Sequence, residues 1–308
     1  MNFRVLILVA TWTMAPLPAL GQAVSDADLQ KRANGILTLM GFAVTPDVTT
    51  GSLSLTDQTA GNPYFRQTSL SGGGTLKSMP LYLEGTLGYG RYDPSFATSD
   101  DPNAPRISVK WNSLLGTGGV GWDFPVAQDL VLRPIFNVSL GRIESQGSVA
   151  PAAPAPGTRS TFDFLGNGRL NAYGVGGSLM LDYERYRPEN EIDVELRYSN
   201  IYLQSFDSSQ SVKGAADAQT LSLWSRYRAP TGLTALDRPV RYVLEYAHTR
   251  FLGDLEGALG FYYVNSFGAG LELDSSARDV FVTRTRLMVR YKVGNNVTGW
   301  AVGLAVGF

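Results

Sequence analysis

The feature that most constrains this chain is an alternation of apolar and polar residues at every second position, repeated in segment after segment from residue 81 to the C-terminus. The last segment shows it most cleanly. Its even positions from 300 to 308 hold large apolar residues, and its odd positions from 299 to 307 hold only glycine or alanine. Successive side chains of a β-strand point to opposite faces, so each segment predicts a strand with two unlike faces. The repetition predicts an all-β fold.

Charged residues fall on the face opposite the large apolar residues. Asp182 and Glu184, for example, alternate with leucine and tyrosine, and we expect Lys110 on the face opposite Val109 and Trp111. Such segregation is typical of a transmembrane β-barrel, in which lipid-facing and lumenal residues alternate. A soluble β-sandwich or lipocalin-like barrel has the same periodicity. The many glycines on the polar face favour the membrane barrel, because glycine weakens strands and a soluble sheet has no reason to place so much of it on its water-facing side.

The number and spacing of the segments predict a closed antiparallel barrel of about twelve strands. Ten segments are well supported, and weaker ones at residues 48–56 and 64–76 complete an even number, which places both ends of the barrel on one side. Long and short connections alternate, as in outer-membrane barrels: the long ones are expected at 93–105, 145–169 and 205–216, and the short ones at 125–129, 187–190 and 274–278. Two connections fit poorly, a long one at 229–239 on the predicted inner side and a tight one at 294–296 on the outer side.

The first residues have the features of a secretory signal peptide. Arg4 gives a short positive region, residues 5–10 are apolar, and residues 19–23 contain small residues suited to cleavage. Pro16 and Pro18 interrupt the apolar stretch well short of the about 20 residues that a membrane-spanning helix needs. An exported β-barrel is expected in the outer membrane of a Gram-negative bacterium. The expected division is a signal peptide over 1–21, with cleavage after 21 or 23, a helix over 24–43, and a barrel over 44–308.

The segment over 24–43 has helical spacing. Ser25 and Asp28 resemble a capping box, apolar residues recur from Leu29 to Met40, and Gly41 is a plausible end. A helix of this length spans roughly 28 Å, close to the height of the apolar band of an outer-membrane barrel. We expect it inside the lumen as a plug; the alternative is a helix free in the periplasm. Small lumenal residues offer it close approach: Gly88, Gly90, Gly174, Gly176, Gly268, Gly270, Gly299, Gly303 and Gly307.

Several stretches resemble the solitary outer-membrane autotransporter β-barrel domains. They are Ser71–Gly74, Leu81-Tyr82-Leu83-Glu84-Gly85, Gly88-Tyr89-Gly90-Arg91-Tyr92-Asp93-Pro94 and the terminal Phe308. The resemblance covers nearly the whole mature chain, and its motifs belong to the barrel and to no active site. In that family the barrel follows an exported passenger, joined to it by a helix through the lumen. This sequence leaves no room for a passenger between the cleavage site and the first strand.

The resemblance also implies an assembly signal in the last strand and a partner that reads it, the barrel-assembly machinery. The residues concerned are Trp300, Val302, Leu304, Val306 and Phe308. The simpler alternative is a lipid-facing strand with no further role, and both can hold together. Family members that cleave themselves use an adjacent asparagine pair on the lumenal helix, whereas this helix offers only Asn34. Self-cleavage is therefore not expected.

The lumen is expected to carry two walls of opposite charge. The acidic wall comprises Asp182, Glu184, Glu191, Asp193 and Glu195, and the basic wall comprises Arg284, Arg286, Arg290 and Lys292. Opposed walls could polarise a water-filled pore and select solutes. Alternatively the charges pair with one another and with the plug, where Lys31 and Arg32 could meet the acidic wall.

Composition excludes several kinds of site. The chain has no cysteine and one histidine, which rules out disulfides, thiolate metal sites and multi-histidine metal sites. A net charge of -1 gives no field that would attract nucleic acid. His248 is the one candidate general base, but Thr249 and Arg250 follow it, so the His-x-Ser pattern of lipid-hydrolysing barrels is absent. An interfacial structural role is the expectation for His248, and no cofactor is expected.

Three hypotheses follow. The first is an autotransporter-type barrel without a passenger domain, its lumen plugged by its own helix, with a structural or transport role and no enzymatic activity. The second is an open diffusion porin for small solutes, and the third is a lipid-modifying enzyme. Outer-membrane lipid and the assembly machinery are the expected partners, and the sequence identifies no solute or passenger.

Overall fold

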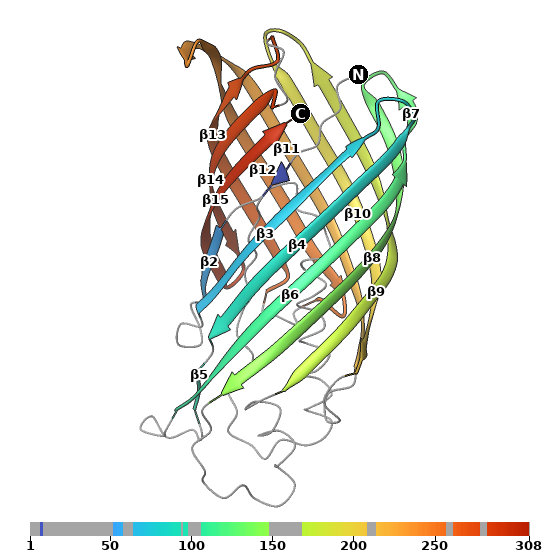
Figure 1. Cartoon of the computed structure of the whole chain (residues 1–308), viewed down its shortest axis with the longest axis vertical. Coiled ribbons are helices and arrows are strands. Elements are labelled where there is room, and N and C mark those ends of the chain that lie inside the picture. Colours follow the sequence, from blue (N-terminus) through green and yellow to red (C-terminus); the bar gives the residue numbers. More distant parts are fainter. Residues whose placement is uncertain are drawn as a thin grey trace, which may run out of the picture.

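The computed structural model describes residues 7–8, 52–57, 64–93, 95–97, 106–147, 168–207, 214–256, 261–277 and 282–307, which form one antiparallel sheet (Figure 1). Its strands are β1 (Ile7–Leu8), β2 (Ser52–Asp57), β3 (Tyr64–Thr75), β4 (Leu81–Asp93), β5 (Ser95–Ala97), β6 (Arg106–Trp122), β7 (Phe124–Ala127), β8 (Leu130–Gly147), β9 (Arg169–Tyr186), β10 (Glu191–Phe206), β11 (Ala215–Ala235), β12 (Arg238–Gly253), β13 (Tyr263–Asp274), β14 (Arg284–Gly294) and β15 (Val297–Gly307). The predicted all-β fold is confirmed. The helix predicted over 24–43 lies outside the described residues.

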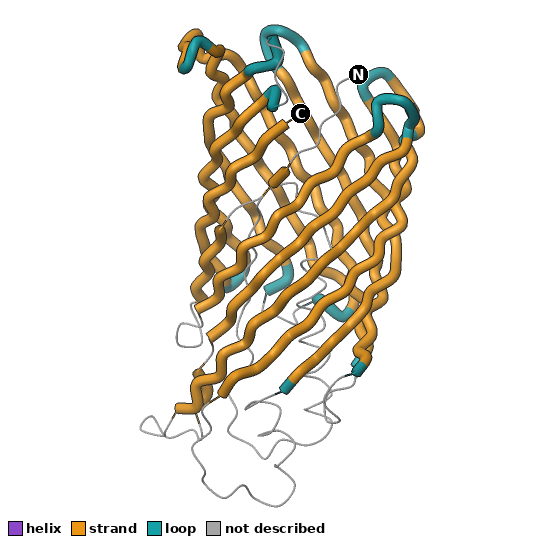
Figure 2. The backbone as a smooth tube through the Cα atoms, in the orientation of Figure 1, coloured by secondary structure: helices purple, strands orange, loops and turns teal. Residues whose placement is uncertain are grey.

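The sheet closes on itself through β2. This short strand pairs with β15 on one side and with β3 on the other. From β3 the ladder runs through β4, β6, β8, β9, β10, β11, β12, β13 and β14 back to β15. Together with β2 these make the predicted twelve-stranded wall, and the strands tilt steeply round it (Figure 2). The remaining strands β1, β5 and β7 are short additions to this wall.

The connections at the end of the barrel where the C-terminus lies are mostly tight (Figure 1). The prediction of a long connection over 229–239 is wrong. There β11 and β12 continue as a hairpin to a two-residue turn at Leu236 and Asp237, both with positive φ (53° and 55°), which is the backbone of a type I′ turn. A bulge between Pro230 and Thr234 absorbs the extra residues. The tight turn after Gly294 is confirmed, whereas the connection that follows Asp274 extends to β14 and is longer than expected.

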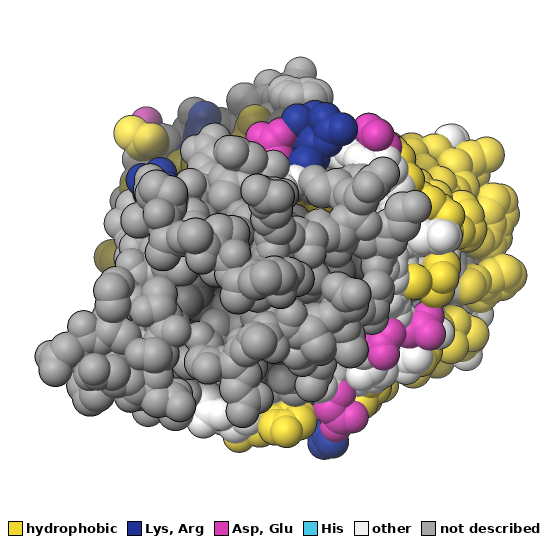
Figure 3. Space-filling model, turned by 90° about the horizontal axis from the view of Figure 1, so that it is seen from below, with side chains coloured by type: hydrophobic (Ala, Val, Ile, Leu, Met, Phe, Trp, Pro, Cys, Tyr) yellow, Lys and Arg dark blue, Asp and Glu magenta, His cyan; other side chains and the backbone are white. Residues whose placement is uncertain are grey.

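The two faces of the wall differ as predicted. Large apolar side chains such as Leu140, Leu196, Phe267 and Trp300 are exposed on the outside. Seen from the end opposite the C-terminus, hydrophobic side chains cover much of the outer wall in view (Figure 3). Charged side chains such as Glu272 are buried on the inside. Such an apolar outer belt is what contact with lipid requires. This is the arrangement of a transmembrane β-barrel.

In β6 the predicted orientation is wrong. Leu114, Val120 and Trp122 are exposed and Leu115 is buried, so the even positions face outward, and Lys110 is exposed with them. Two adjacent leucines break the alternation in this strand, so periodicity alone could not fix its parity. Lys110 lies four residues before Leu114, near the beginning of the strand at Arg106, where an outward charge does not have to enter lipid.

Among the described residues, no helix is long and apolar enough to cross a membrane.

Candidate functional site

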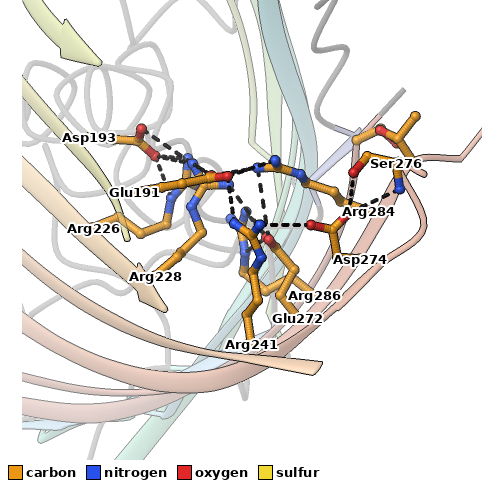
Figure 4. A network of polar contacts seen from close by, with 12 residues as sticks. Glu191, Asp193, Arg226, Arg228, Arg241, Glu272, Asp274, Ser276, Arg284 and Arg286 are labelled. Atoms are coloured by element: carbon orange, nitrogen blue, oxygen red, sulfur yellow. Dashed lines mark hydrogen bonds and ion pairs between the residues drawn. The ribbon is translucent and has the colours of Figure 1, made fainter. Parts of the chain in front are cut away.

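Most lumenal charges form ion pairs in three groups, here together called the charged zone, near the end of the barrel that holds the short turns. In the largest group, acidic and basic side chains from several strands point toward one another (Figure 4). Its central residue is Glu191, the first residue of β10. Arg284 of β14 donates two hydrogen bonds to its carboxylate, at 2.7 and 2.8 Å. Arg228 lies 2.8 Å and Arg241 2.5 Å from the same carboxylate. One acidic group therefore receives three guanidinium groups from three different strands.

A second carboxylate, Asp193, is shared by two arginines of β11. Arg226 donates from Nε at 2.8 Å and also from Nη2, and Arg228 donates at 3.0 Å. Arg228 is only 1 % exposed, so its charge depends wholly on Asp193, Glu191 and Glu272, the last at 3.6 Å. Burying a cation is tolerated only when it is paired and hydrogen-bonded in this way.

The predicted basic wall contacts acids of neighbouring strands as well as the acidic wall. Arg286 donates two hydrogen bonds to Glu272, at 2.9 and 2.5 Å, and Arg290 donates two to Glu245, at 2.8 and 2.6 Å. Glu272 lies on β13, which pairs with β14, and Glu245 lies on β12, the next strand beyond β13. The two expected walls are thus one interdigitated network, in which Arg284 of the basic wall contacts the acidic wall through its ion pair with Glu191.

A second part of the charged zone joins β10 to β4. Arg197 donates two hydrogen bonds to Glu84, at 2.8 and 2.7 Å, and Asn137 of β8 donates a third at 2.7 Å. Ser178 and Ser199 complete the site, Ser178 donating to Asn137 at 2.7 Å and accepting from Arg197 at 2.9 Å. Because the side chains of both Glu84 and Arg197 are at most 5 % exposed, this pair is fully enclosed.

A third group lies beside it. Arg133 of β8 binds Asp123 at 2.5 Å and Asp182 at 2.9 Å, and its guanidinium stacks over the ring of Tyr82 at 4.0 Å. One oxygen of Asp182 is buried without a hydrogen-bond partner. Glu195 stands directly opposite Asp182 in the β9–β10 ladder.

Two of these contacts cross the lumen. Three strands separate β4 from β10 in the wall, and three others separate β10 from β14. Side chains on strands so far apart in the sheet meet only through the interior of the barrel. Arg197 with Glu84 and Glu191 with Arg284 therefore form two bridges, here called the lumenal bridges, which tie β10 to both sides of the wall.

Lumenal glycines make room for these side chains. A Cβ atom on Gly119 would lie 2.5 Å from Asn137 Nδ2 and 2.6 Å from Glu84 Cγ, and one on Gly268 would lie 3.1 Å from Arg290 Cγ. A Cβ atom on Gly174 would lie 2.6 Å from Leu203 Cδ2. At Gly268 and Gly174, two of the glycines expected to admit a helix, the wall's own side chains thus use the space.

Toward the opposite end the lumenal face is apolar, and this region is here called the apolar zone. It comprises Ile143, Leu170, Ala172, Ile201, Leu203 and Phe251, all buried on strands β8, β9, β10 and β12. Leu170 and Leu203 are 0 % exposed. A wall that lined a water-filled channel would leave such side chains wet.

The predicted site residues differ in burial and in pairing. Five of them are both buried and paired: Asp182, Glu191, Asp193, Arg286 and Arg290. Arg284 is paired but only partly buried, and Lys292 is buried. Glu184 is exposed near the end of β9, opposite Asp193 in the ladder. Glu195 is partly buried, and no hydrogen bond or ion pair joins it to another described residue.

Several residues of these ion pairs lie outside the two predicted walls: Glu84, Arg133, Arg197, Arg226, Arg228, Arg241, Glu245 and Glu272. The alternation in the sequence places these residues on the lumenal face, but contacts between non-adjacent strands depend on the curvature of the closed wall. The predicted assembly-signal residues Trp300, Val302 and Leu304 are exposed on the outer face. Val306 is partly exposed, and the side chain of Phe308 lies outside the described residues.

His248 lies on β12 among outward-facing residues. Its Nδ1 is 2.9 Å from Asn265 Oδ1, which also accepts a hydrogen bond from Tyr246 at 3.1 Å, and its ring stacks on Tyr263 at 5.8 Å. Similar tyrosine–amide hydrogen bonds recur on the outer face at Tyr89–Asn112, Tyr173–Gln204 and Tyr198–Gln219. No hydroxyl nucleophile is bonded to His248 among the described residues. In that part of the chain there is also no cluster of three metal-ligating side chains.

The fold is that of known translocator barrels. No family model matches the sequence, and no curated protein does. The structure resembles the translocator domain of the autotransporter NalP from Neisseria meningitidis (TM-score 0.51, 11 % identity, covering 100 % of this chain and 88 % of that one). It also resembles the transport unit of the autotransporter AIDA-I from Escherichia coli (TM-score 0.51, 10 % identity, 90 % and 99 %). A KdgM porin matches at a TM-score of 0.42, with 11 % identity over 84 % and 98 % of the two chains, too low to carry an argument.

Proposed function

We propose that this chain, which has the fold of autotransporter translocator barrels, is an outer-membrane barrel with a closed lumen and a structural or transport role. The observation that carries the proposal is the pair of lumenal bridges, because each joins strands four positions apart in the twelve-stranded wall through its interior, where an open porin needs a clear path. Open diffusion porins select solutes with charges that face water. Here most of the charges are buried in pairs.

The bridges are costly to open. Both members of the Arg197–Glu84 pair are enclosed, and separating them would leave two desolvated charges without partners. A solute passing this level would have to replace the hydrogen bonds of each group that it displaced. The charged zone therefore favours a barrier over a diffusion path.

The apolar zone supports a plug formed by the predicted helix over 24–43. Leu170 and Leu203 are lumenal and have no exposed surface, which fits a lumen filled by apolar side chains. The predicted helix carries a matching apolar stripe at Leu29, Ile36 and Leu37. Burying the two apolar faces against each other is worth roughly 25 cal/mol per Å² removed from water.

Glu195 gives this helix an electrostatic partner. Like charges directly opposite each other in a ladder repel, and Glu195 faces Asp182 in this way. Since Asp193 and Glu191 are occupied by arginines, Glu195 is the member of the acidic wall best placed to receive Lys31 or Arg32.

A crosslink tests the position of the helix directly, because the chain has no cysteine of its own. Arg32→Cys combined with Glu195→Cys should form a disulfide in the folded barrel. Arg32→Cys with Glu184→Cys, at the exposed end of β9, is the matched control. Deleting residues 24–42 should also raise the conductance of the barrel in a planar bilayer. A folded barrel that shows neither effect would put the helix outside the lumen.

The enzymatic alternative has a separate test. Because His248 is bonded to an amide and stacked on a tyrosine, we propose a structural role for it at the edge of the lipid-facing belt. Purified outer membranes with His248→Ala should show unchanged phospholipid and lipid A. A loss of a modified lipid in that variant would revive the enzyme hypothesis.

A further inference from the structure

The wall of the barrel has one incomplete seam, between β3 and β15. Strand β2 fills it only in part. Its first residue, Ser52, pairs with Thr68 on β3 and with Val302 on β15. Beyond that level β3 continues to Thr75 and β15 to Gly307. Strand β2 covers neither of these two extensions.

The two residues of β1 occupy part of this gap. Leu8 pairs with Ala305 on one side and with Ser71 on the other, and Ile7 pairs with Val306. Both residues belong to the segment predicted as a signal peptide. If the signal peptide is removed, the facing edges of β3 and β15 lose this partner. Unpaired backbone N–H and C=O groups at the depth of the membrane find no water to bond in lipid and are strongly disfavoured, so the gap must be filled again.

The register of β2 identifies the segment that can fill it. Extending both β2 ladders by three residues toward the N-terminus places residue 49 opposite Ala305 and opposite Ser71, which are the two partners of Leu8. Residue 48 then falls opposite Val306, the partner of Ile7. Strand β1 thus occupies the positions that a longer β2 would hold, in the same direction and in the same register.

The residues at these positions suit a strand. Val48, Thr49 and Thr50 are β-branched, a type enriched in strands, and they lead into Ser52 without an intervening proline. Pro46 lies just before them, where a strand tolerates proline at its beginning. No insertion or bulge is needed to continue the ladders.

We propose that the slot between β3 and β15 accepts residues 48–51 of this chain, which extend β2 and take the place of β1 when the signal peptide is removed. The proposal rests on the predicted cleavage and is independent of whether the lumen is closed. It makes the last segment before Ser52 a part of the wall.

Paired cysteines test the register. In mature protein from outer membranes, Thr49→Cys with Ala305→Cys should form a disulfide, since directly opposite residues have the Cα separation that a disulfide requires. Thr49→Cys with Ala301→Cys, four residues away on the same face, is the control, and the first pair should give on the order of tenfold more disulfide. Heat-modifiable migration in gels confirms that both variants are folded.

Two outcomes of the disulfide experiments would overturn the proposal. One is a folded mature barrel in which residues 49 and 305 form no more disulfide than the control pair. The other is a mature chain whose mass includes residues 7 and 8 and in which Leu8→Cys forms a disulfide with Ala305→Cys. A backbone test is independent of cysteines: Thr49→Pro removes a ladder N–H and should lower the unfolding temperature of the barrel, whereas Thr45→Pro, before the slot, should not. Equal effects of the two prolines would also contradict the proposal.

Discussion

The charged zone and the apolar zone of the lumen are enclosed by the same strands but stabilised by different means. In the charged zone, β10 is linked to β4 and to β14 by ion pairs within the wall itself. In the apolar zone, Leu170 and Leu203 are buried without any polar partner, so that region depends on packing. The comparison teaches that the side chains of one barrel wall can hold two levels of the lumen by different means, ion pairs between strands at one level and apolar packing at the other.

Removing one partner of a lumenal bridge should have the largest effect. Arg197→Ala leaves the enclosed Glu84 carboxylate uncompensated and should lower the free energy of unfolding by about 3–5 kcal/mol. Arg142→Ala is the matched control, because its partner Glu144 is exposed and such surface pairs contribute about 1 kcal/mol or less. Urea unfolding of both variants in lipid vesicles measures the difference. Equal losses would remove the distinction between the bridge and a surface pair.

The apolar zone is tested by Leu203→Ala. If the lumen is tightly filled at this level, the cavity should cost about 2–5 kcal/mol in the same unfolding assay. Leu179→Ala, on the lipid-facing side and half exposed, should cost clearly less, since lipid can fill the space. A result for Leu203 no larger than that for Leu179 would mean that water or lipid reaches the apolar zone.

On the outer face, a charge can be compared at two depths of the lipid-facing belt without changing either lumenal zone. Leu196→Arg places a charge in the middle of the lipid-facing belt and should cost about 2–4 kcal/mol, against about 0–1 kcal/mol for Gln204→Arg near the end of the same face. Ser178 and Ser199 look like tolerant lumenal sites in the sequence, but both belong to the Arg197 bridge and are unsuitable controls. Equal folded yields of the two variants would contradict the assignment of faces.

The smallest expected effect concerns the space beside Glu84. Gly119→Ala would place a methyl group 2.5 Å from Asn137 and should cost about 1–3 kcal/mol by overpacking. The neighbouring Gly118→Ala meets only Val138, at an ordinary 3.9 Å, and should be nearly neutral. If both changes are neutral, the bridge has more freedom than its contacts indicate.

Much of the wall could be predicted from the sequence, because an alternation with period two constrains both strand type and facing direction. The orientation of β10, with Leu196 outside and Arg197 inside, follows from parity alone. The error in β6 arose where Leu114 and Leu115 are adjacent, and the error at the β11–β12 turn arose because a bulge at Gly232 is not visible in the pattern.

The candidate site was less accessible to prediction. Parity shows that Glu84 and Arg197 both face the lumen, but they are separated by 113 positions in the chain and by three strands in the sheet. Their contact depends on the curvature of the wall and on the space above Gly119, neither of which has a sequence signature. Residue types alone therefore could not show whether the lumenal charges form two separate walls or one interdigitated network.

The most direct test of the closed lumen is a planar-bilayer recording of the intact mature protein, with the Glu84→Gln/Arg197→Gln variant beside it. The account predicts no steady conductance from the intact barrel and more frequent openings from the variant, which loses both charges of one bridge without leaving either unpaired. Steady, ohmic conductance from the intact barrel, unchanged in the variant, would contradict the closed lumen and make an open porin the better description.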